Sequence, residues 1–318
     1  MSDKTKIIIG SRGSALALWQ SNFIKKEIEN ANPDVEIEIQ LIKTMGDNIL
    51  DVPLAKIGDK GLFTKELENE LLAGNIDIAV HSLKDLPTDL PKGLKLAAVT
   101  KRHNCEDVLI TKNAGTAIET LPQGATVGTG SLRRKCQIKS IRPDLNVVDL
   151  RGNVPTRIKK FLQSDWEAII LARAGVERLN MEKYISSVIS VDQILPAVGQ
   201  GALGIEIKKT NKAVEKILKS IHDDETFAAV TAERAFLKAL DGGCQVPIGA
   251  YAQVRPTGLF MEGLVGSIEG DKIFRSKMRG SKKEAEKLGK NLAEELLNAG
   301  AKEILSEIYN PVPSEKSV

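Results

Sequence analysis

The feature that most constrains the fold is the alternation of short apolar segments with helical patterns along about the first two thirds of the chain. An apolar segment at 7–9 runs into a glycine turn, a helical pattern at 15–29 and a strictly alternating strand pattern at 35–42. Further strand-like apolar segments follow at 76–80 and 168–172. Strands that alternate with helices form parallel sheets covered by helices. We therefore expect two doubly wound α/β domains here.

Beyond about Ile221 the pattern changes. A long helical pattern ends near Asp241 and is followed by apolar stretches at 246–254 and 258–270, which are typical of neighbouring antiparallel strands. We expect a smaller C-terminal α+β domain there. The expected boundaries are 1–100 with 200–220 for domain 1, 101–199 for domain 2, 221–312 for domain 3, and 313–318 for a loose tail.

Charge and cysteine content exclude several classes of protein. The chain has 45 Lys and Arg against 42 Asp and Glu, so no uniform basic surface indicates nucleic acid. Its three cysteines are never spaced as CxxC, and their odd number does not fit a disulfide framework. No segment has the length of a membrane span or the apolar core of a signal peptide. We expect a cytoplasmic protein with no metal site, no nucleic-acid partner and no membrane span.

Three segments share a plan that favours anion binding. In each, a strand-like stretch runs into a loop of small residues that opens a helix, and arginine lies in or just after the loop. They are IIIGSRGSALAL at 7–18, ATVGTGSLRRKC at 125–136 and VVDLRGNVPTRIKK at 147–160. Helix N-termini expose unpaired N–H groups, and guanidinium groups bind carboxylate or phosphate in a bidentate manner. We expect an anion site here, with four lysines on solvated helix faces: Lys135, Lys139, Lys159 and Lys160.

The segment GTGSLR at 128–133 also imitates a dinucleotide-binding motif. In that motif a third glycine allows the helix to pack closely on the strand, and Arg133 stands at its position here. No GxxxxGK[ST] phosphate-binding loop occurs in the chain. A nucleotide-linked oxidoreductase is therefore disfavoured.

Three side chains have two interpretations each when only the neighbouring residues are considered. Asp85 follows an apolar strand, at the strand end where open α/β sheets bind ligands, but an acid before Leu-Pro also suits a turn. His81 is either a structural histidine or a base. Cys244 follows an expected helix C-terminus, unlike an activated thiolate, and is either a buried structural cysteine or a covalent attachment point.

Seven ordered motifs link these features. They are GSRGSALALWQ at 10–20, GDKGLFTKELE at 58–68, HSLKDLPT at 81–88, GTGSLRR at 128–134, LRGNVPTR at 150–157, VGQGALGIE at 198–206 and GGCQVPIGA at 242–250. Together they resemble the porphobilinogen deaminase (hydroxymethylbilane synthase) family of tetrapyrrole and heme biosynthesis, over nearly the whole chain up to about Tyr309. The resemblance implies three domains, two of them like type II periplasmic binding proteins, with the active cleft between these two.

The resemblance also implies a transferase activity and a cofactor. Enzymes of this family join four porphobilinogen molecules head to tail, release ammonia each time, and hydrolyse the product to hydroxymethylbilane. The chain grows on one covalent dipyrromethane primer, which a thioether holds to the cysteine corresponding to Cys244. The catalytic aspartate corresponds to Asp85.

Carboxylate-binding residues follow from the same resemblance. The cofactor-binding set is Lys84, Ser131, Arg133 and Arg134. The substrate-binding set, for porphobilinogen and the growing oligopyrrole, is Arg12, Ser14, Gln20, Arg151, Arg157, Arg178 and Gln200. Lys56 and Lys60 lie in a glycine-bearing stretch and are expected on a lid over the cleft. Arg173 adds a charge where a small or apolar residue is expected, and its role stays open.

An alternative of another class is a non-catalytic carboxylate-binding protein of periplasmic-binding-protein fold. It would use the same arginine-rich helix ends but would need neither Cys244 nor Asp85. The lack of a signal-peptide pattern argues against it. We expect a monomeric enzyme instead.

Overall fold

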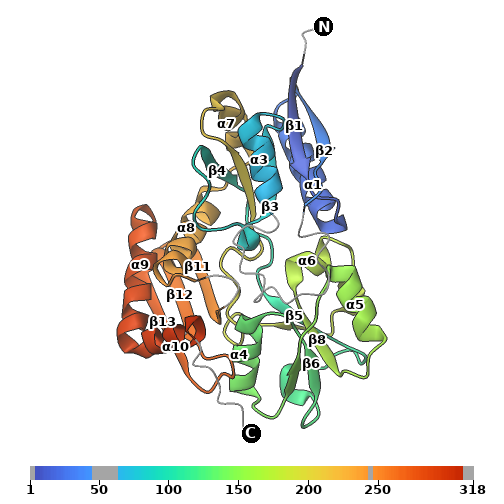
Figure 1. Ribbon diagram of the computed structural model, residues 1–318, viewed down its shortest axis with the longest axis vertical. Coiled ribbons are helices and arrows are strands. Elements are labelled where there is room, and N and C mark those ends of the chain that lie inside the picture. Colours follow the sequence, from blue (N-terminus) through green and yellow to red (C-terminus); the bar gives the residue numbers. More distant parts are fainter. Residues whose placement is uncertain (1–3, 45–63, 243–245, 311–318) are drawn as a thin grey trace.

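The computed structural model describes residues 4–44, 64–242 and 246–310, and its strands form two five-stranded sheets and one three-stranded sheet (Figure 1). The first sheet has the order β2-β1-β3-β10-β4. Its strands are β1 (Thr5–Ser11), β2 (Val35–Leu41), β3 (Ile78–Ser82), β4 (Leu94–Val99) and β10 (Leu203–Lys208). Strands β2, β1 and β3 are parallel, whereas β10 is antiparallel to both of its neighbours.

Helices cover both faces of this sheet. They are α1 (Ala15–Ala31), α3 (Lys65–Ala73), α7 (Lys212–Leu218) and the 3-10 turns η2 (Leu83–Asp85) and η5 (Lys219–Ile221). Ile24 and Ile28 of α1 pack with Ile9 in one hydrophobic cluster. Leu67 and Leu71 of α3 belong to another cluster. The apolar period of the helices therefore matches the two buried faces of the strands, as doubly wound packing requires.

The second sheet repeats the same plan, with the order β7-β6-β8-β5-β9. Its strands are β5 (Asp107–Thr111), β6 (Thr126–Gly128), β7 (Asn146–Val148), β8 (Ala168–Ala172) and β9 (Ser187–Ile189). Its helices are α4 (Leu132–Ile141), α5 (Val154–Leu162), α6 (Arg173–Glu177) and the turns η3 (Ile118–Thr120) and η4 (Glu182–Tyr184). Ile138 of α4 and Phe161 of α5 belong to different clusters, so they cover opposite faces.

The chain passes between the two sheets twice, after β4 and again before β10. These two crossings lie side by side, because Thr100 N–H donates to the Leu203 carbonyl at 3.1 Å and His103 N–H donates to the Gly201 carbonyl at 3.2 Å. In each sheet one antiparallel strand, β10 or β5, is inserted after three parallel strands. This shared order confirms the expected pair of doubly wound domains resembling type II periplasmic binding proteins.

The C-terminal unit is the expected α+β domain. Its meander consists of β11 (Ile248–Arg255), β12 (Gly258–Gly266) and β13 (Ile273–Gly280). Its helices are α8 (Asp224–Ala239), α9 (Ala285–Leu296), α10 (Lys302–Tyr309), the 3-10 turn η6 (Lys282–Glu284) and the π-helical turn η7 (Leu297–Ala301). Phe236 of α8 and Leu292 of α9 pack in one core with Val265 of β12. Gly289 allows α9 to approach the backbone of α8, since a Cβ there would clash with the Ala232 carbonyl.

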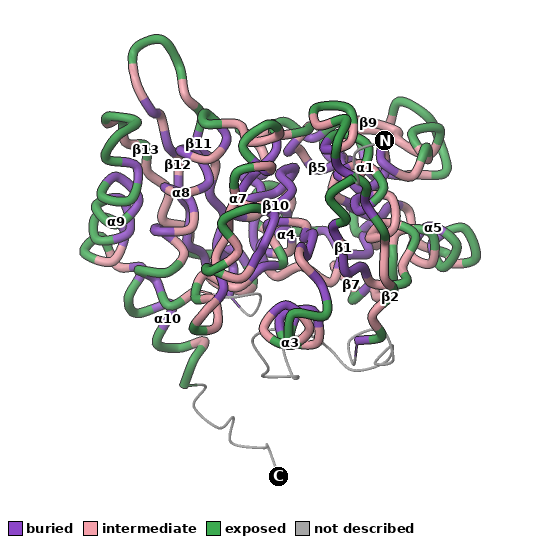
Figure 2. Tube along the Cα trace, turned by 90° about the horizontal axis from the view of Figure 1, so that it is seen from above, coloured by how far each residue is buried: buried purple, intermediate pink, exposed green. Residues whose placement is uncertain are grey.

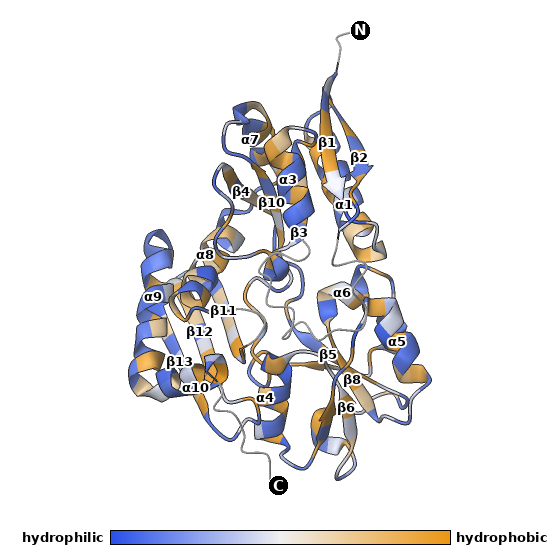
Figure 3. Ribbon diagram, in the orientation of Figure 1, coloured by the Kyte–Doolittle hydropathy of each residue, from blue (hydrophilic) through white to orange (hydrophobic). Residues whose placement is uncertain are grey.

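Burial follows this layered plan. Buried residues concentrate along strands such as β10, whereas large parts of α5 and α9 are exposed (Figure 2). Both of these helices carry hydrophobic and hydrophilic residues, as expected of helices with one buried side (Figure 3). In the ranges that the structure covers, no helix is both long and apolar enough to cross a membrane.

Candidate active site

The acid predicted for catalysis lies at the carboxyl end of β3. The strand ends at Ser82 and turns directly into η2, whose first residue, Leu83, is 1 % exposed and donates its N–H to the Ala202 carbonyl at 3.0 Å. This buried anchor holds the turn against β10, while the side chain of Asp85 at the end of the turn is exposed. The sequence places the carboxylate at a strand end, and the packing of Leu83 directs it outward.

Arg12, Ser14, Gln20 and Asp85 line one small cavity of about 80 Å³ beside this turn. The N-terminus of α1 forms part of its wall, where Ser14 Oγ accepts the Ala17 N–H at 3.3 Å as the N-cap. Gln20 is buried, and its Nε2 donates to Ser82 Oγ at 2.7 Å, which ties α1 to the end of β3. Predicted substrate residues and the predicted acid therefore meet in one place.

A buried contact between a histidine and a carboxylate lies beside this cavity. His81 also lines the cavity, and its Nε2 lies 3.0 Å from Oε2 of Glu206 on β10. Both side chains are buried, Glu206 completely. The other oxygen of Glu206, Oε1, is buried with no hydrogen-bond partner among the described residues. His81 thus has a satisfied structural partner, which supports the structural interpretation made from its sequence neighbours.

The two predicted cofactor-binding arginines share one buried carboxylate. Nη2 of Arg133 donates to Oδ2 of Asp107 at 2.9 Å, and Nη2 of Arg134 donates to Oδ1 at 2.7 Å. All three side chains are at most 5 % exposed. Burial alone raises the pKa of Asp107, but the two guanidinium groups outweigh it and hold this pKa well below its usual range. The cluster consequently keeps one net positive charge.

Asp107 is the member of this cluster that the sequence analysis did not single out. Its only local signal is an acid at the start of an otherwise apolar strand, at 107–111. Its position also links the two domains, because Gln200 in the second crossing donates its Nε2 to Asp107 Oδ1 at 2.9 Å. Lys84, next to the predicted acid, donates to Gln200 Oε1 at 3.5 Å. Burial lowers the pKa of Lys84 to about 8, with Asp85 opposing this shift and Arg134 adding to it.

Side chains of the small-residue loops cap the N-termini of α4 and α5. Ser131 Oγ accepts the Arg134 N–H at 3.5 Å at the start of α4. Asn153 Oδ1 accepts the Thr156 N–H at 3.0 Å at the start of α5. Gly152 precedes this second cap with a φ of 116°, a conformation that favours glycine. Local sequence therefore sets both helix ends.

Positive charge accumulates around Arg157. Its Nε donates to the Gly152 carbonyl at 2.6 Å, while Nε of Arg151 donates to Asp149 at 3.2 Å. Burial and the charges of Arg134 and Arg151 together lower the pKa of Arg157 to about 10, and Asp85 opposes the shift. Asp85 and the arginines of α4 and α5 thus act on one another across the two domains. An anionic ligand would relieve this repulsion.

Arg178 is buried between the two domains. It is 7 % exposed, its Nη2 donates to the Gly201 carbonyl at 2.8 Å, and its guanidinium lies 5.6 Å from the ring centroid of Trp19 on α1. Burial lowers its pKa to about 10. Arg178 therefore joins the second domain to α1 and to the second crossing.

Unpaired buried donors test whether these residues fit the expected cofactor. Within the described ranges, the Nε groups of Arg133, Arg134 and Arg178 are buried without a hydrogen-bond partner. Buried guanidinium donors are normally satisfied. Carboxylate side chains of a dipyrromethane are suitable acceptors for such donors. The donor set therefore fits the group.

Other predicted residues lie elsewhere or outside the described ranges. Cys244, Lys56 and Lys60 fall outside them, as does the tail at 313–318. Arg173 pairs with Glu177 at 2.7 Å and with Glu106 at 3.4 Å, which accounts for its charge. Lys159 and Lys160 are exposed, as expected of a solvated helix face. No group of three or more metal-ligating side chains is found in the part of the chain that the structure describes.

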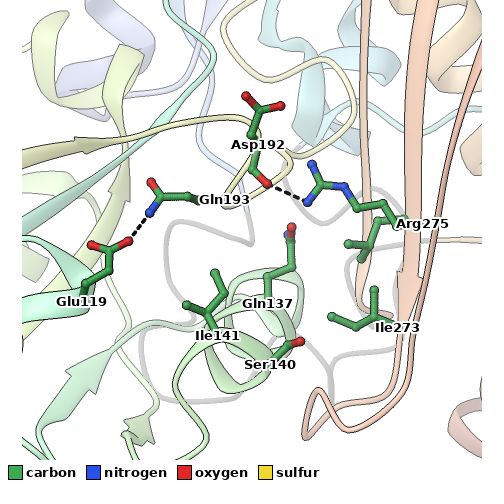
Figure 4. A pocket seen from close by; sticks show the side chains of 9 residues that line it. Glu119, Gln137, Ser140, Ile141, Asp192, Gln193, Ile273 and Arg275 are labelled. Carbon is green, nitrogen blue, oxygen red and sulfur yellow. Dashed lines mark hydrogen bonds between the residues drawn. The ribbon is translucent and has the colours of Figure 1, made fainter.

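A larger cavity, of about 400 Å³, lies apart from these residues between α4 and the C-terminal sheet (Figure 4). Its one guanidinium, that of Arg275, already donates to Glu262 at 2.5 Å and to the Asp192 carbonyl at 2.8 Å. None of the predicted site residues that fall within the described ranges lines this cavity. Its size therefore does not make it the catalytic site.

Two family models and several curated relatives match this chain. Residues 7–216 match the family model "Porphobilinogen deaminase, dipyromethane cofactor binding domain", and 227–298 match "Porphobilinogen deaminase, C-terminal domain". A porphobilinogen deaminase of Carboxydothermus hydrogenoformans is 52% identical over 305 residues, covering 96% of this chain and 98% of that protein. One of Syntrophobacter fumaroxidans is 47% identical over 309 residues, covering 97% and 99%.

Among solved structures, the methionine-binding protein MetQ aligns with a TM-score of 0.44 at 12% identity, over 70% of this chain and 92% of that one. Taken together, the family models cover most of the sequence, and the relatives match at about half identity along its length. The chain belongs to the porphobilinogen deaminase family.

Proposed function

We propose that this chain performs the family's reaction in the cleft between its two doubly wound domains, with Asp85 as the catalytic acid. Four porphobilinogen molecules are joined head to tail with loss of ammonia, and hydroxymethylbilane is released by hydrolysis. The observation that carries the assignment is that an exposed Asp85 shares a cavity with Arg12 and Ser14 and interacts electrostatically with Arg157. A non-catalytic binding protein is not favoured, because the curated relatives are named as deaminases.

The cofactor residues of this proposal include the two arginines that pair with Asp107. Dipyrromethane would be held by Lys84, Ser131, Arg133 and Arg134 and attached to Cys244, which lies in the segment between α8 and β11. When bound, it supplies a pyrrole α-carbon for the first condensation. Asp107 accepts from Nη2 of both arginines and so fixes the orientation of their guanidinium groups, including the Nε donors that have no partner.

The substrate residues serve the carboxylates of porphobilinogen and of the growing oligopyrrole. They are Arg12, Ser14, Gln20, Arg151, Arg157, Arg178 and Gln200. Each charge-assisted hydrogen bond contributes about 1.5 to 3 kcal/mol. Gln20 and Gln200 hold walls of the cleft, through Ser82 and Asp107 respectively.

Asp85 acts on the charge that develops during condensation. Loss of ammonia from porphobilinogen that is protonated at its amino group leaves a cationic ring. The α-carbon of a second pyrrole attacks this ring. The same α-carbon then loses its proton, which restores the aromatic pyrrole. A carboxylate about 4 Å from this charge stabilises it by about 4 kcal/mol at an effective dielectric constant near 20. If this stabilisation acts only in the transition state, it raises the rate of condensation about a thousandfold. Asp85 would also accept that proton and pass it to the amino group of the next porphobilinogen.

The proposal extends to several broader properties. The domain boundaries are those given from the sequence, which the membership of β10 in the first sheet and of β5–β9 in the second supports. We further propose a cytoplasmic monomer that acts on a small molecule rather than on nucleic acid, consistent with a net charge of +3. Lys56 and Lys60 would belong to a lid over the cleft.

Asp85→Asn tests the central assignment, with Asp89→Asn as the matched control. Asp89 lies in the same loop, is 72% exposed and pairs with Lys238. We expect Asp85→Asn to keep a two-pyrrole mass adduct on the Cys244 peptide while turnover of porphobilinogen falls about a thousandfold. Asp89→Asn should turn over at the wild-type rate. Near-normal turnover by Asp85→Asn, or active wild-type protein with an unmodified thiol, would contradict the proposal.

A further inference from the structure

A guanidinium of the C-terminal domain holds the backbone that follows Asp85. Helix α8 lies between the C-terminal sheet and the first domain (Figure 1). Its Arg234 is half-buried and donates to three successive carbonyl groups of this backbone. Nη1 donates to the carbonyl of Leu86 at 2.9 Å, and Nη2 donates to those of Pro87 at 2.6 Å and Thr88 at 3.3 Å.

These three carbonyl groups depend on Arg234. Residues 86–88 lie outside any helix or strand, and no backbone N–H in the described part of the chain donates to their oxygens. On the other side of Asp85, Leu83 is fixed by burial and by its bond to Ala202. The turn that carries the acid is therefore held at one end by the first sheet and at the other by α8.

The same helix leads to the segment that contains Cys244. Arg234 precedes the end of α8 at Ala239 by five residues, or about 8 Å at 1.5 Å per residue. The helix is fixed in the C-terminal core through Phe236, and the backbone beyond it by a bond from the Tyr309 hydroxyl to the Asp241 carbonyl at 2.6 Å. A rigid element thus connects the loop of the acid with the approach to the attachment cysteine.

We propose that Arg234 is a positioning residue, which fixes the backbone beside Asp85 to α8 and so keeps the acid in a constant position relative to the C-terminal domain. A planar guanidinium suits this role because its fork of donors can satisfy several carbonyl groups at fixed angles, whereas an ammonium cannot. Displacement of a catalytic group by about 1 Å can lower a rate about a hundredfold. The inference rests on the proposed role of Asp85.

The test compares Arg234→Gln and Arg234→Lys with Lys238→Gln in the full-length, primer-loaded enzyme. Lys238 lies one helical turn further along α8 and contacts Asp89 of the same loop, but it is 57% exposed. For both Arg234 variants we expect kcat to fall 10- to 100-fold while KM for porphobilinogen and the primer adduct mass stay as in the wild type. The lysine variant should lose less than the glutamine variant. Lys238→Gln should keep kcat within twofold.

Hydrogen exchange of the peptide spanning 83–90 provides a second measurement on the same samples. Faster exchange there, at unchanged overall stability, is expected for both Arg234 variants. The inference is overturned if kcat of the folded, primed Arg234→Lys protein equals that of the wild type, or if Lys238→Gln loses as much. If Arg234→Gln does not fold, Arg234→Lys decides. Failure of the proposed function would appear differently, as full activity of Asp85→Asn.

Discussion

Replacing Asp107 by Asn tests how the anion site is held together. The carboxylate is fully buried, and each of its oxygens accepts from a different guanidinium, Oδ1 from Arg134 and Oδ2 from Arg133. Asparagine has nearly the same shape but no charge, and its NH2 group would face a donor instead of accepting from it. Two buried cations would then remain without their counter-charge.

The expected loss of stability is large. Breaking a buried ion pair by removing one partner costs about 3–5 kcal/mol. Because two guanidinium groups share this carboxylate, we expect a loss of about 5 kcal/mol in the free energy of unfolding, which is comparable with the whole stability of many domains. Glu269→Gln is the matched control. Glu269 pairs with Lys135 of the same helix α4 but is 62% exposed, so its substitution should cost about 0–1 kcal/mol.

The pH dependence has a definite sign. The pKa of Asp107 is held below its unfolded-state value of about 3.9. A carboxylate of this kind adds stability above the unfolded-state pKa, and this stability is lost as the pH falls toward the folded-state pKa. The difference between wild type and Asp107→Asn should therefore be constant between about pH 5 and 7 and shrink below about pH 4.

Urea unfolding followed by circular dichroism gives both quantities. The double variant Asp107→Asn with Arg133→Met should recover part of the loss, because one unneutralised cation is removed. An Asp107→Asn protein as stable as Glu269→Gln at pH 7 would refute the reasoning. So would a difference from wild type that persists unchanged below about pH 4.

Three further predictions concern other buried groups. The pKa of Lys84 is lowered to about 8 in the folded protein, whereas it is about 10.4 in the unfolded chain. Between these two pH values the unfolded chain binds more protons than the folded protein, so the free energy of unfolding rises with pH. Lys84→Met should remove this rise in urea unfolding, and an unchanged slope would contradict it. Glu233, 0% exposed, accepts from Arg102, Gly199 N–H and Ala252 N–H, so Glu233→Gln should lower the unfolding free energy by about 3–5 kcal/mol. A change in the unfolding free energy of less than about 1 kcal/mol would show that the charge of Glu233 does not stabilise the fold in this way. Gly289→Ala should destabilise the α8–α9 contact by about 1–3 kcal/mol, because the methyl group meets backbone, and an unchanged melting temperature would count against it.

Local features of the fold could be predicted from the sequence. The strand at 168–172 has the predicted bounds, because apolar residues continue through it. The residues just before α1, α4 and α5 cap these helices. In each case a side-chain oxygen accepts a hydrogen bond from the N–H group three residues later. The helix at 154–162 begins earlier than its apolar pattern, since Asn153 caps it and Pro155 is tolerated in the first turn.

The connections within the site could not be predicted in this way. Asp107 is 26 residues from Arg133, and Lys84 is 116 residues from Gln200. His81 meets Glu206 only because β10 inserts antiparallel between β3 and β4. No periodicity in the intervening sequence specifies such a pair. The resemblance to a family indicated which arginines to examine, but not the carboxylate that two of them share.

By itself, the sequence determined the α/β alternation, the helix caps and the excess of arginine at helix ends, because these depend on residues a few positions apart. Only the tertiary structure decided which charges are neutralised and which remain for a ligand. Two sheets of the same strand order, with one inserted strand in each, bring such distant segments together. Charge pairing depends on distance and burial, which the order of residues along a chain does not contain.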